Sequence, residues 1–288
     1  MKFGKVEDSS GIDFTLPTST KDTIELLSAN KDYQTFQLYV GCARWGRADL
    51  KGFYPRGTKD DLRYYSQQFN AIEFNSTFYH VPSKEQVISW YQRTNEDFKF
   101  FPKIPQSISH YSRLLNVEEK VNSFVDTTAL FDDKLGMSFL QLREDFKPKL
   151  FDRLAHFLHH FPKGFPLAVE VRNEEWFNSK IFSDFVGLLK ETQMTNMIVD
   201  TPGRRDVLHM HLTNPTAFIR FVATNTAVDY QRLDRWVAQI KEWKALGLSN
   251  CYFFIHQPLE KETPLLASYF VKQLNDTLDL KLPVAQKF

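Results

Sequence analysis

Short apolar runs that end in a charged or amide side chain recur along this chain and constrain its fold more than any other feature. The clearest is 167–172, where Leu-Ala-Val-Glu-Val-Arg places Glu170 and Arg172 two residues apart, and therefore on one face of a strand. A charge inside so apolar a strand costs several kcal/mol unless it is paired or used. Similar runs lead into Asn75, Lys103, Asp200, Arg220 and His256. Strands that finish in reactive groups are typical of an active-site barrel.

Eight runs are predicted to be strands, and the segments between them carry helix signals. The predicted strands are 38–43, 71–75, 98–103, 137–142, 167–172, 197–200, 217–222 and 251–256. Ser83 followed by Gln86 is a capping box, which marks a helix start. Segments 148–161 and 229–246 each place their apolar residues on one stripe, as helices packed on a sheet do.

Eight strands that alternate with helices predict an α/β fold, a TIM-type (β/α)8 barrel. An open doubly wound sheet would require a glycine-rich phosphate turn after its first strand, and segment 41–46 lacks that spacing. The barrel is expected to span 38–288. Residues 1–37 are polar and only weakly helical in pattern, so we expect an N-terminal extension that lies on the barrel or is partly disordered.

The bulk properties exclude some classes of partner. A net charge of +1 provides no general attraction for nucleic acid or membranes. The N-terminus lacks the apolar core of a signal peptide, and no apolar run reaches membrane-spanning length, so we expect a cytoplasmic protein with no membrane partner.

Several motifs resemble those of one known family, the YecE-like family (domain of unknown function 72). They are Gly41 to Trp45, Gly52-Phe53-Tyr54-Pro55, the Glu-Phe-Asn-Ser-Thr-Phe-Tyr segment at 73–79, and Glu170-Val171-Arg172 with Trp176. The resemblance covers roughly 38–275 and implies a TIM-type barrel without an established reaction. The chain departs from the family pattern at 223–225, where a glycine is expected, and at His256-Gln257, where an Asn pair is common. No substrate is therefore carried over from relatives.

Polar groups at the strand ends are expected to gather at the barrel mouth. The candidate catalytic residues are Glu73, Glu170, Asp200 and His256. The candidate substrate-binding residues are Trp45, Asn75, Tyr79, Lys103, Gln141, Arg172, Trp176 and Arg220. We expect one glutamate with a pKa raised by burial to act as acid and the other, held ionised, to act as base. The cations would bind phosphate or carboxylate, and the aromatic rings would stack on a sugar or a base.

These residues predict an enzyme, a hydrolase or an isomerase, that acts on a phosphorylated or otherwise anionic sugar or nucleotide. Three alternatives stay open. The charges could satisfy one another as a structural ion-pair network. The mouth and a basic rim could bind nucleic acid or a phosphorylated ligand without turnover. This basic rim consists of Arg44, Arg47, Lys51, Arg56, Arg204 and Arg205. The four candidate catalytic residues could instead hold Mg²⁺, Mn²⁺ or Zn²⁺, as in a metal-dependent phosphodiesterase-like or isomerase-like enzyme. Nearby cations oppose this, so no metal ligand is assigned and the cofactor is left open.

Overall fold

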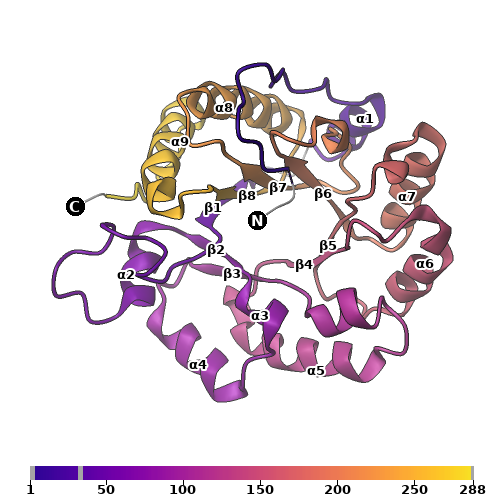
Figure 1. Ribbon diagram of the computed structural model, residues 1–288, viewed down its shortest axis with the longest axis horizontal. Helices are drawn as coiled ribbons and strands as arrows, with labels where there is room; N and C mark the ends of the chain where they lie inside the picture. Colours follow the sequence, from indigo (N-terminus) through magenta and orange to yellow (C-terminus); the bar gives the residue numbers. More distant parts are fainter. Residues whose placement is uncertain (1–3, 32–34, 287–288) are drawn as a thin grey trace.

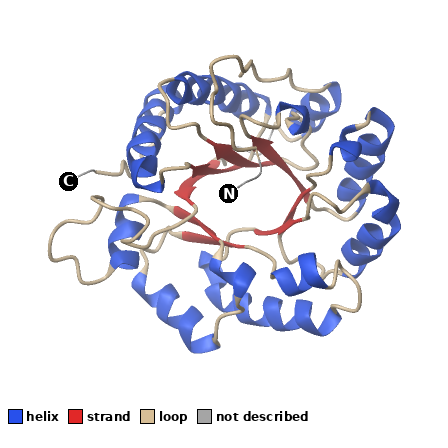
Figure 2. Cartoon of the chain, in the orientation of Figure 1, coloured by secondary structure: helices blue, strands red, loops and turns tan. Residues whose placement is uncertain are grey.

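The computed structural model describes residues 4–31 and 35–286, and in this part of the chain eight parallel strands form a closed ring (Figure 2). The strands are β1 (Gln37–Cys42), β2 (Ala71–Phe74), β3 (Lys99–Pro102), β4 (Ser138–Gln141), β5 (Leu167–Glu170), β6 (Thr195–Asp200), β7 (Thr216–Val222) and β8 (Asn250–His256). The helices surround this ring (Figure 1). They are α1 (Lys21–Ala29), α2 (Asp61–Gln68), α3 (Ser76–Tyr79), α4 (Lys84–Arg93), α5 (Glu118–Thr128), α6 (Phe151–His160), α7 (Ser179–Glu191), α8 (Val228–Leu246) and α9 (Thr263–Leu278).

The strand order β3-β2-β1-β8-β7-β6-β5-β4 confirms the predicted barrel. The ring closes between β3 and β4, where Gly136 N donates to Phe100 O at 2.8 Å and Ile104 N donates to Phe139 O at 2.9 Å. The predicted capping box of Ser83 is also present at the start of α4. Because all the strands are parallel, their carboxyl ends share one mouth.

Side chains alternate between the barrel interior and the layer beneath the helices. In β2, Ala71 packs inside the barrel, whereas Ile72 and Phe74 pack in the outer layer. The interior is filled by an aromatic layer that includes Phe101, Phe139, Phe218 and Phe254. Inward-facing residues two positions further along each strand lie above this layer, at the mouth.

The N-terminal segment lies against the barrel. Helix α1 packs beside α8 and buries Leu27 completely. The hydroxyl of Thr23 donates to Met210 O and accepts from Leu212 N, both at 2.9 Å, which attaches α1 to the loop before β7. Residues before α1 then reach the barrel mouth. This arrangement brings a segment with no strand or helix signal of its own close to the strand ends.

Candidate active site

A buried polar layer closes the bottom of the mouth. It consists of the inward-facing residues Glu73, Lys103, Gln141, Glu170, Arg220 and His256. Their burial is a direct consequence of period-two alternation, because each follows an inward-facing residue of the apolar layer by two positions. The structure therefore brings six of the predicted site residues together, with Asn75 and Arg172 adjoining them.

Arg220 occupies the centre of this layer. Its Nε and Nη2 donate to the two carboxylate oxygens of Glu73 at 2.9 and 3.0 Å, and its Nη1 donates to Glu170 Oε2 at 3.0 Å. All three side chains are fully buried. A guanidinium that forms a bidentate pair with one carboxylate and also bonds a second is held rigidly. Arg220 therefore does not reach the ligand space, contrary to its predicted anion-binding role.

Both glutamates are held ionised. Burial alone would raise the pKa of Glu73, but Arg220 and His256 outweigh it and lower the pKa well below its usual range. Burial likewise opposes ionisation of Glu170, but Arg172 and Arg220 lower the pKa of that carboxyl to about 2. The predicted division into one protonated acid and one ionised base is therefore not supported, because neighbouring cations dominate at both sites.

The remaining oxygen positions of the two carboxylates are also occupied. Glu73 accepts hydrogen bonds from Asn75 Nδ2 at 2.9 Å and is 2.8 Å from His256 Nε2. Glu170 accepts from Gln141 Nε2 at 2.9 Å and from Arg172. Such saturated carboxylates position their neighbours and are poorly suited to receive a substrate proton or a metal ion.

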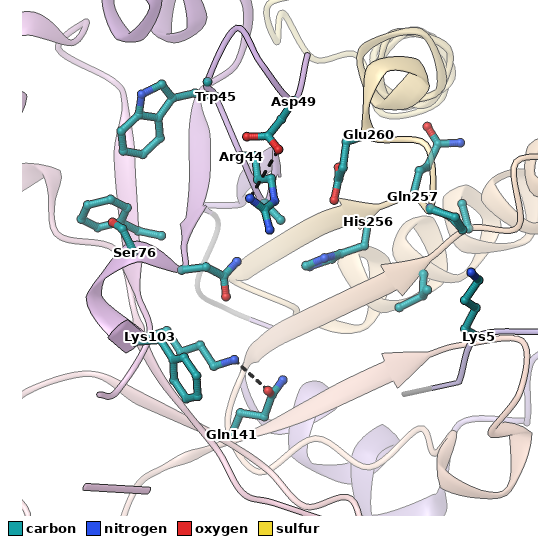
Figure 3. A pocket seen from close by; sticks show the side chains of 18 of the residues that line it. Lys5, Arg44, Trp45, Asp49, Ser76, Lys103, Gln141, His256, Gln257 and Glu260 are labelled. Carbon is teal, nitrogen blue, oxygen red and sulfur yellow. Dashed lines mark hydrogen bonds and ion pairs between the residues drawn. The ribbon is translucent and has the colours of Figure 1, made fainter. Parts of the chain in front are cut away.

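A cavity of about 510 Å³ opens above this polar layer. The predicted residues that line it are Trp45, Asn75, Tyr79, Lys103, Gln141 and His256. Figure 3 shows Lys103 and Gln141 joined at the base of this space, with the Glu260 carboxyl pointing toward His256. The cavity is large enough for a small ligand. Its reactive surface is therefore Lys103, the amides and His256, and not the buried ion pairs beneath.

Lys103 is the cation at the floor of the cavity. It is 8% exposed, its Nζ donates to Gln141 Oε1 at 2.7 Å, and the Phe78 ring centroid lies 4.2 Å away. Among the described residues, no carboxylate forms an ion pair with this amine. Burial, together with the charges of Arg220 and Arg172, lowers the pKa of Lys103 to about 7. Near neutral pH this side chain exchanges its proton readily.

Three charged cavity residues were not predicted to lie at the site: Lys5, Asp49 and Glu260. Arg44 belongs to the predicted basic rim, and Gln257 to the His256-Gln257 pair noted in the sequence. Burial raises the pKa of Glu260, which lies in a short 3₁₀ helix (Glu260–Glu262) after β8. Gln257 follows directly after His256 at the end of a predicted strand, and this position was the signal that predicted it at the mouth. Lys5 had none, because tertiary docking of the N-terminal segment places it at the mouth.

Asp200 and Trp176 do not lie at the mouth. Val199 pairs in register with the inward-facing Arg220, so Asp200, one residue later, faces the outer layer. There it accepts hydrogen bonds at 2.8 Å from Arg232 Nη2 and Trp236 Nε1. Trp176 is buried beneath the helices and donates to the carbonyl of Phe146 at 2.7 Å. Both placements correct the predicted site.

A metal centre does not fit these residues. Asp200 faces the outer layer, whereas Glu73 faces the barrel interior, and the oxygens of Glu73 and Glu170 are engaged by guanidinium and amide groups. In the described ranges, no group of three His, Cys, Asp or Glu side chains is arranged to hold a metal ion. The rearrangement needed to free these ligands would break buried ion pairs.

The basic rim is largely neutralised by carboxylates. Arg44 pairs with Asp49 at 3.4 Å, and Arg47 pairs with Asp61 at 2.7 Å. Arg204 similarly pairs with Asp206 at 2.7 Å. Strong nucleic-acid binding requires several uncompensated cations. These pairs therefore weaken the alternative in which the rim binds a polynucleotide.

The N-terminal segment crosses the edge of the cavity. Gly4 O accepts hydrogen bonds from Gly203 N at 2.8 Å and from Thr201 Oγ1 at 3.2 Å. Gly4 has a φ of +69°, and a Cβ at Gly203 would lie 2.9 Å from the Gly4 carbonyl carbon. Close backbone packing of two glycines therefore docks this segment and delivers Lys5 to the cavity wall.

Comparisons with known proteins agree with this architecture. A family model described as "Protein of unknown function DUF72" matches residues 39–287. The chain is 25% identical over 264 residues to the UPF0759 protein YecE of Escherichia coli. This match covers 84% of this chain and 94% of that relative. It is 26% identical over 175 residues to the UPF0759 protein YunF of Bacillus subtilis, covering 57% of this chain and 61% of that relative.

Two solved structures share the fold. A DUF72 family protein from Enterococcus faecalis matches with a TM-score of 0.66 at 18% identity, covering 88% of this chain and 99% of that one. A DUF72 family protein from Thermotoga maritima matches with a TM-score of 0.64 at 22% identity, covering 85% of this chain and 100% of that one.

In the described part of the chain, no helix is both long and apolar enough to cross a membrane.

Proposed function

The chain belongs to the DUF72 family, and from this premise we propose that it is an enzyme acting on a small anionic sugar or nucleotide in the cavity at the barrel mouth. The observation that carries the proposal is the placement of Lys103. A nearly buried amine without a carboxylate partner among the described residues lines the floor of the cavity. Its charge, when present, favours an anionic ligand.

The cavity wall supports a ligand with hydroxyl groups and a flat face. Asn75, Gln141 and Gln257 present amides, which can both donate and accept hydrogen bonds. Trp45 and Tyr79 offer aromatic surface at the entrance, and Tyr79 is 71% exposed. A ring that stacks on aromatic surface while its hydroxyls meet amides is a common mode of sugar or nucleoside binding.

Two titratable groups in the cavity support acid–base chemistry. Burial and nearby guanidinium groups lower the pKa of Lys103 to about 7, which makes it a base near neutral pH. Burial raises the pKa of the Glu260 carboxyl. A lowered amine pKa and a raised carboxyl pKa approach one another, so that both groups can exchange protons near one pH. Lys103 and Glu260 thus replace Glu73 and Glu170 in the proposed roles.

The proposal is tested by a thermal-shift screen of sugar phosphates, nucleotides and their uncharged counterparts, followed by calorimetry of each hit. We expect the charged compounds to stabilise the wild-type protein and to lose at least about tenfold in affinity for Lys103→Met. Lys134→Met is the matched control, because Lys134 is also buried but lies outside the cavity. Equal binding to wild type and Lys103→Met would refute the site.

Turnover is then followed by NMR for every compound that binds. An unchanged ligand spectrum after prolonged incubation with each hit would favour binding without catalysis. Binding of a short oligonucleotide, with affinity that falls steeply with salt, would instead support the polynucleotide alternative.

A further inference from the structure

Lys103 meets the structural conditions under which a lysine becomes a nucleophile. Such a lysine is desolvated by apolar walls or lies next to other cations, so that its amine stays unprotonated. Lys103 is 8% exposed, and its Nζ lies 4.2 Å from the Phe78 ring centroid and 5.9 Å from that of Phe139. Arg172 and Arg220 are the nearby cations that disfavour its protonation.

A second buried lysine shows what a purely structural amine looks like in this protein. Lys134 is 5% exposed, and its Nζ donates to the carbonyls of Tyr91 and Thr94, each at 2.7 Å, and to Thr94 Oγ1 at 3.3 Å. Three acceptors satisfy the three protons of an ammonium group. Lys103 has one hydrogen-bond acceptor among the described residues, Gln141, and lines an open cavity.

We propose that Lys103 forms a Schiff base with a carbonyl carbon of the substrate, which narrows the substrate class to small anionic aldehydes and ketones. This inference rests on the proposed function. The Lys103 nitrogen forms a bond to the carbonyl carbon, and the carbonyl oxygen takes one amine proton. The resulting hydroxyl leaves as water with the second amine proton, and a carbon–nitrogen double bond remains. No oxidant or reductant is required.

The other cavity residues suit the remaining parts of such a substrate. Glu260 is a carboxyl in the same cavity that can relay the second amine proton to the departing hydroxyl. Lys5 lines the cavity and can meet the anionic group of the substrate. The buried Oε1 of Gln257 has no hydrogen-bond partner within the described ranges, so a substrate hydroxyl can satisfy it.

Reductive trapping tests this step directly. The full chain is incubated with glycolaldehyde phosphate or with uncharged glycolaldehyde, treated with borohydride, digested and mapped by mass spectrometry. We expect a reduced adduct on Lys103 at least about tenfold more abundant than on Lys134 or on the exposed Lys180. The phosphorylated aldehyde should label Lys103 at lower concentration than the uncharged one. Denaturation before labelling should remove the preference, and Lys103→Arg should remove the adduct.

The outcomes separate this inference from the proposed function. Calorimetric binding of glycolaldehyde phosphate without an adduct on Lys103 would overturn the Schiff base and leave the anionic site intact. Absence of both binding and adduct for every anionic aldehyde and ketone tested, together with no binding of any sugar phosphate or nucleotide, would overturn both. Equal labelling of Lys103, Lys134 and Lys180 would show non-selective amine chemistry and would also refute the inference.

Discussion

Arg220 forms a bidentate ion pair with Glu73 in the barrel interior, although the two residues lie 147 positions apart in the chain. The pair joins β7 to β2 across the barrel, and Glu170 from β5 adds a third strand. Because both carboxylates are ionised and saturated, this arrangement forms a rigid base for the cavity. In the proposed function, the chemistry is carried by the groups above this base, foremost Lys103.

Glu73→Gln should lower the free energy of unfolding by about 3–5 kcal/mol, because the buried guanidinium of Arg220 then keeps only one of its two carboxylate partners. Urea denaturation measures this change. Asp184→Asn is the control, since the exposed Lys180–Asp184 pair should contribute less than about 1 kcal/mol. A loss for Glu73→Gln as small as that of the control would contradict the role assigned to this pair.

The two buried lysines should respond oppositely to substitution by methionine. Lys103→Met removes a poorly satisfied amine and should raise the free energy of unfolding at pH 7 by about 1–2 kcal/mol. Lys134→Met leaves two buried carbonyls without a donor and should lower it by about 1–3 kcal/mol. Denaturant titration of both variants distinguishes a functional lysine from a structural one. Destabilisation by both would argue that Lys103 is structural.

The stability of the wild-type protein should also depend on pH through Lys103. Its pKa is about 7 in the folded state and near the ordinary lysine value of 10.5 when the chain is unfolded. The unfolded chain therefore binds more protons between pH 7 and about 10, and this residue makes stability rise with pH across that window. Comparison of denaturation curves for wild type and Lys103→Met isolates the effect. An identical dependence of the free energy of unfolding on pH in both proteins would contradict this role of Lys103.

Anion affinity should fall as pH rises through neutrality. Lys103 is charged below pH 7 and attracts an anion, and it loses that charge above pH 7. We expect a decrease of up to about tenfold per pH unit above this pKa, measured by calorimetry with a sulfated analogue whose own charge is constant. Lys103→Arg stays charged and should lack this slope. A slope that persists in Lys103→Arg would belong to another group, such as Glu260.

Gly203→Ala should release the N-terminal segment from the mouth. The added Cβ would lie 2.9 Å from the backbone of Gly4, whereas Gly11→Ala, the control, meets no atom within 4 Å. Hydrogen exchange measures the result, because the amide at position 203 donates to Gly4 O. We expect exchange at least about tenfold faster in Gly203→Ala and unchanged in Gly11→Ala. Retained protection would mean that the segment adapts without undocking.

Asp200→Asn should lower stability without weakening ligand binding. Asp200 accepts from Arg232 and Trp236 beneath the helices, so loss of its charge leaves a buried guanidinium undercompensated. A decrease of about 3 kcal/mol in the free energy of unfolding is expected. Calorimetry at a temperature where the variant is folded should give the wild-type affinity. A loss of ligand affinity in Asp200→Asn without a loss of stability would mean that Asp200 contributes to ligand binding.

The sequence alone determined the barrel and most of its polar layer. Apolar runs that alternate with amphipathic helices predict parallel strands, and period two predicts that Glu73, Lys103, Glu170, Arg220 and His256 face inward. These are local properties, because they depend only on the spacing of residues within one strand. The motifs that resemble the YecE-like family are also short segments, and they imply the same barrel.

Only the tertiary structure decided which of these groups can meet a ligand. The register of β6 against β7 turned Asp200 outward, and the pairing of Arg220 with two distant carboxylates removed all three from the cavity surface. The approach of Lys5 depends on contacts between Gly4 and the loop after β6. Such outcomes require atoms from segments far apart in sequence to share one space, and the free energy of each charge depends on the partners found there.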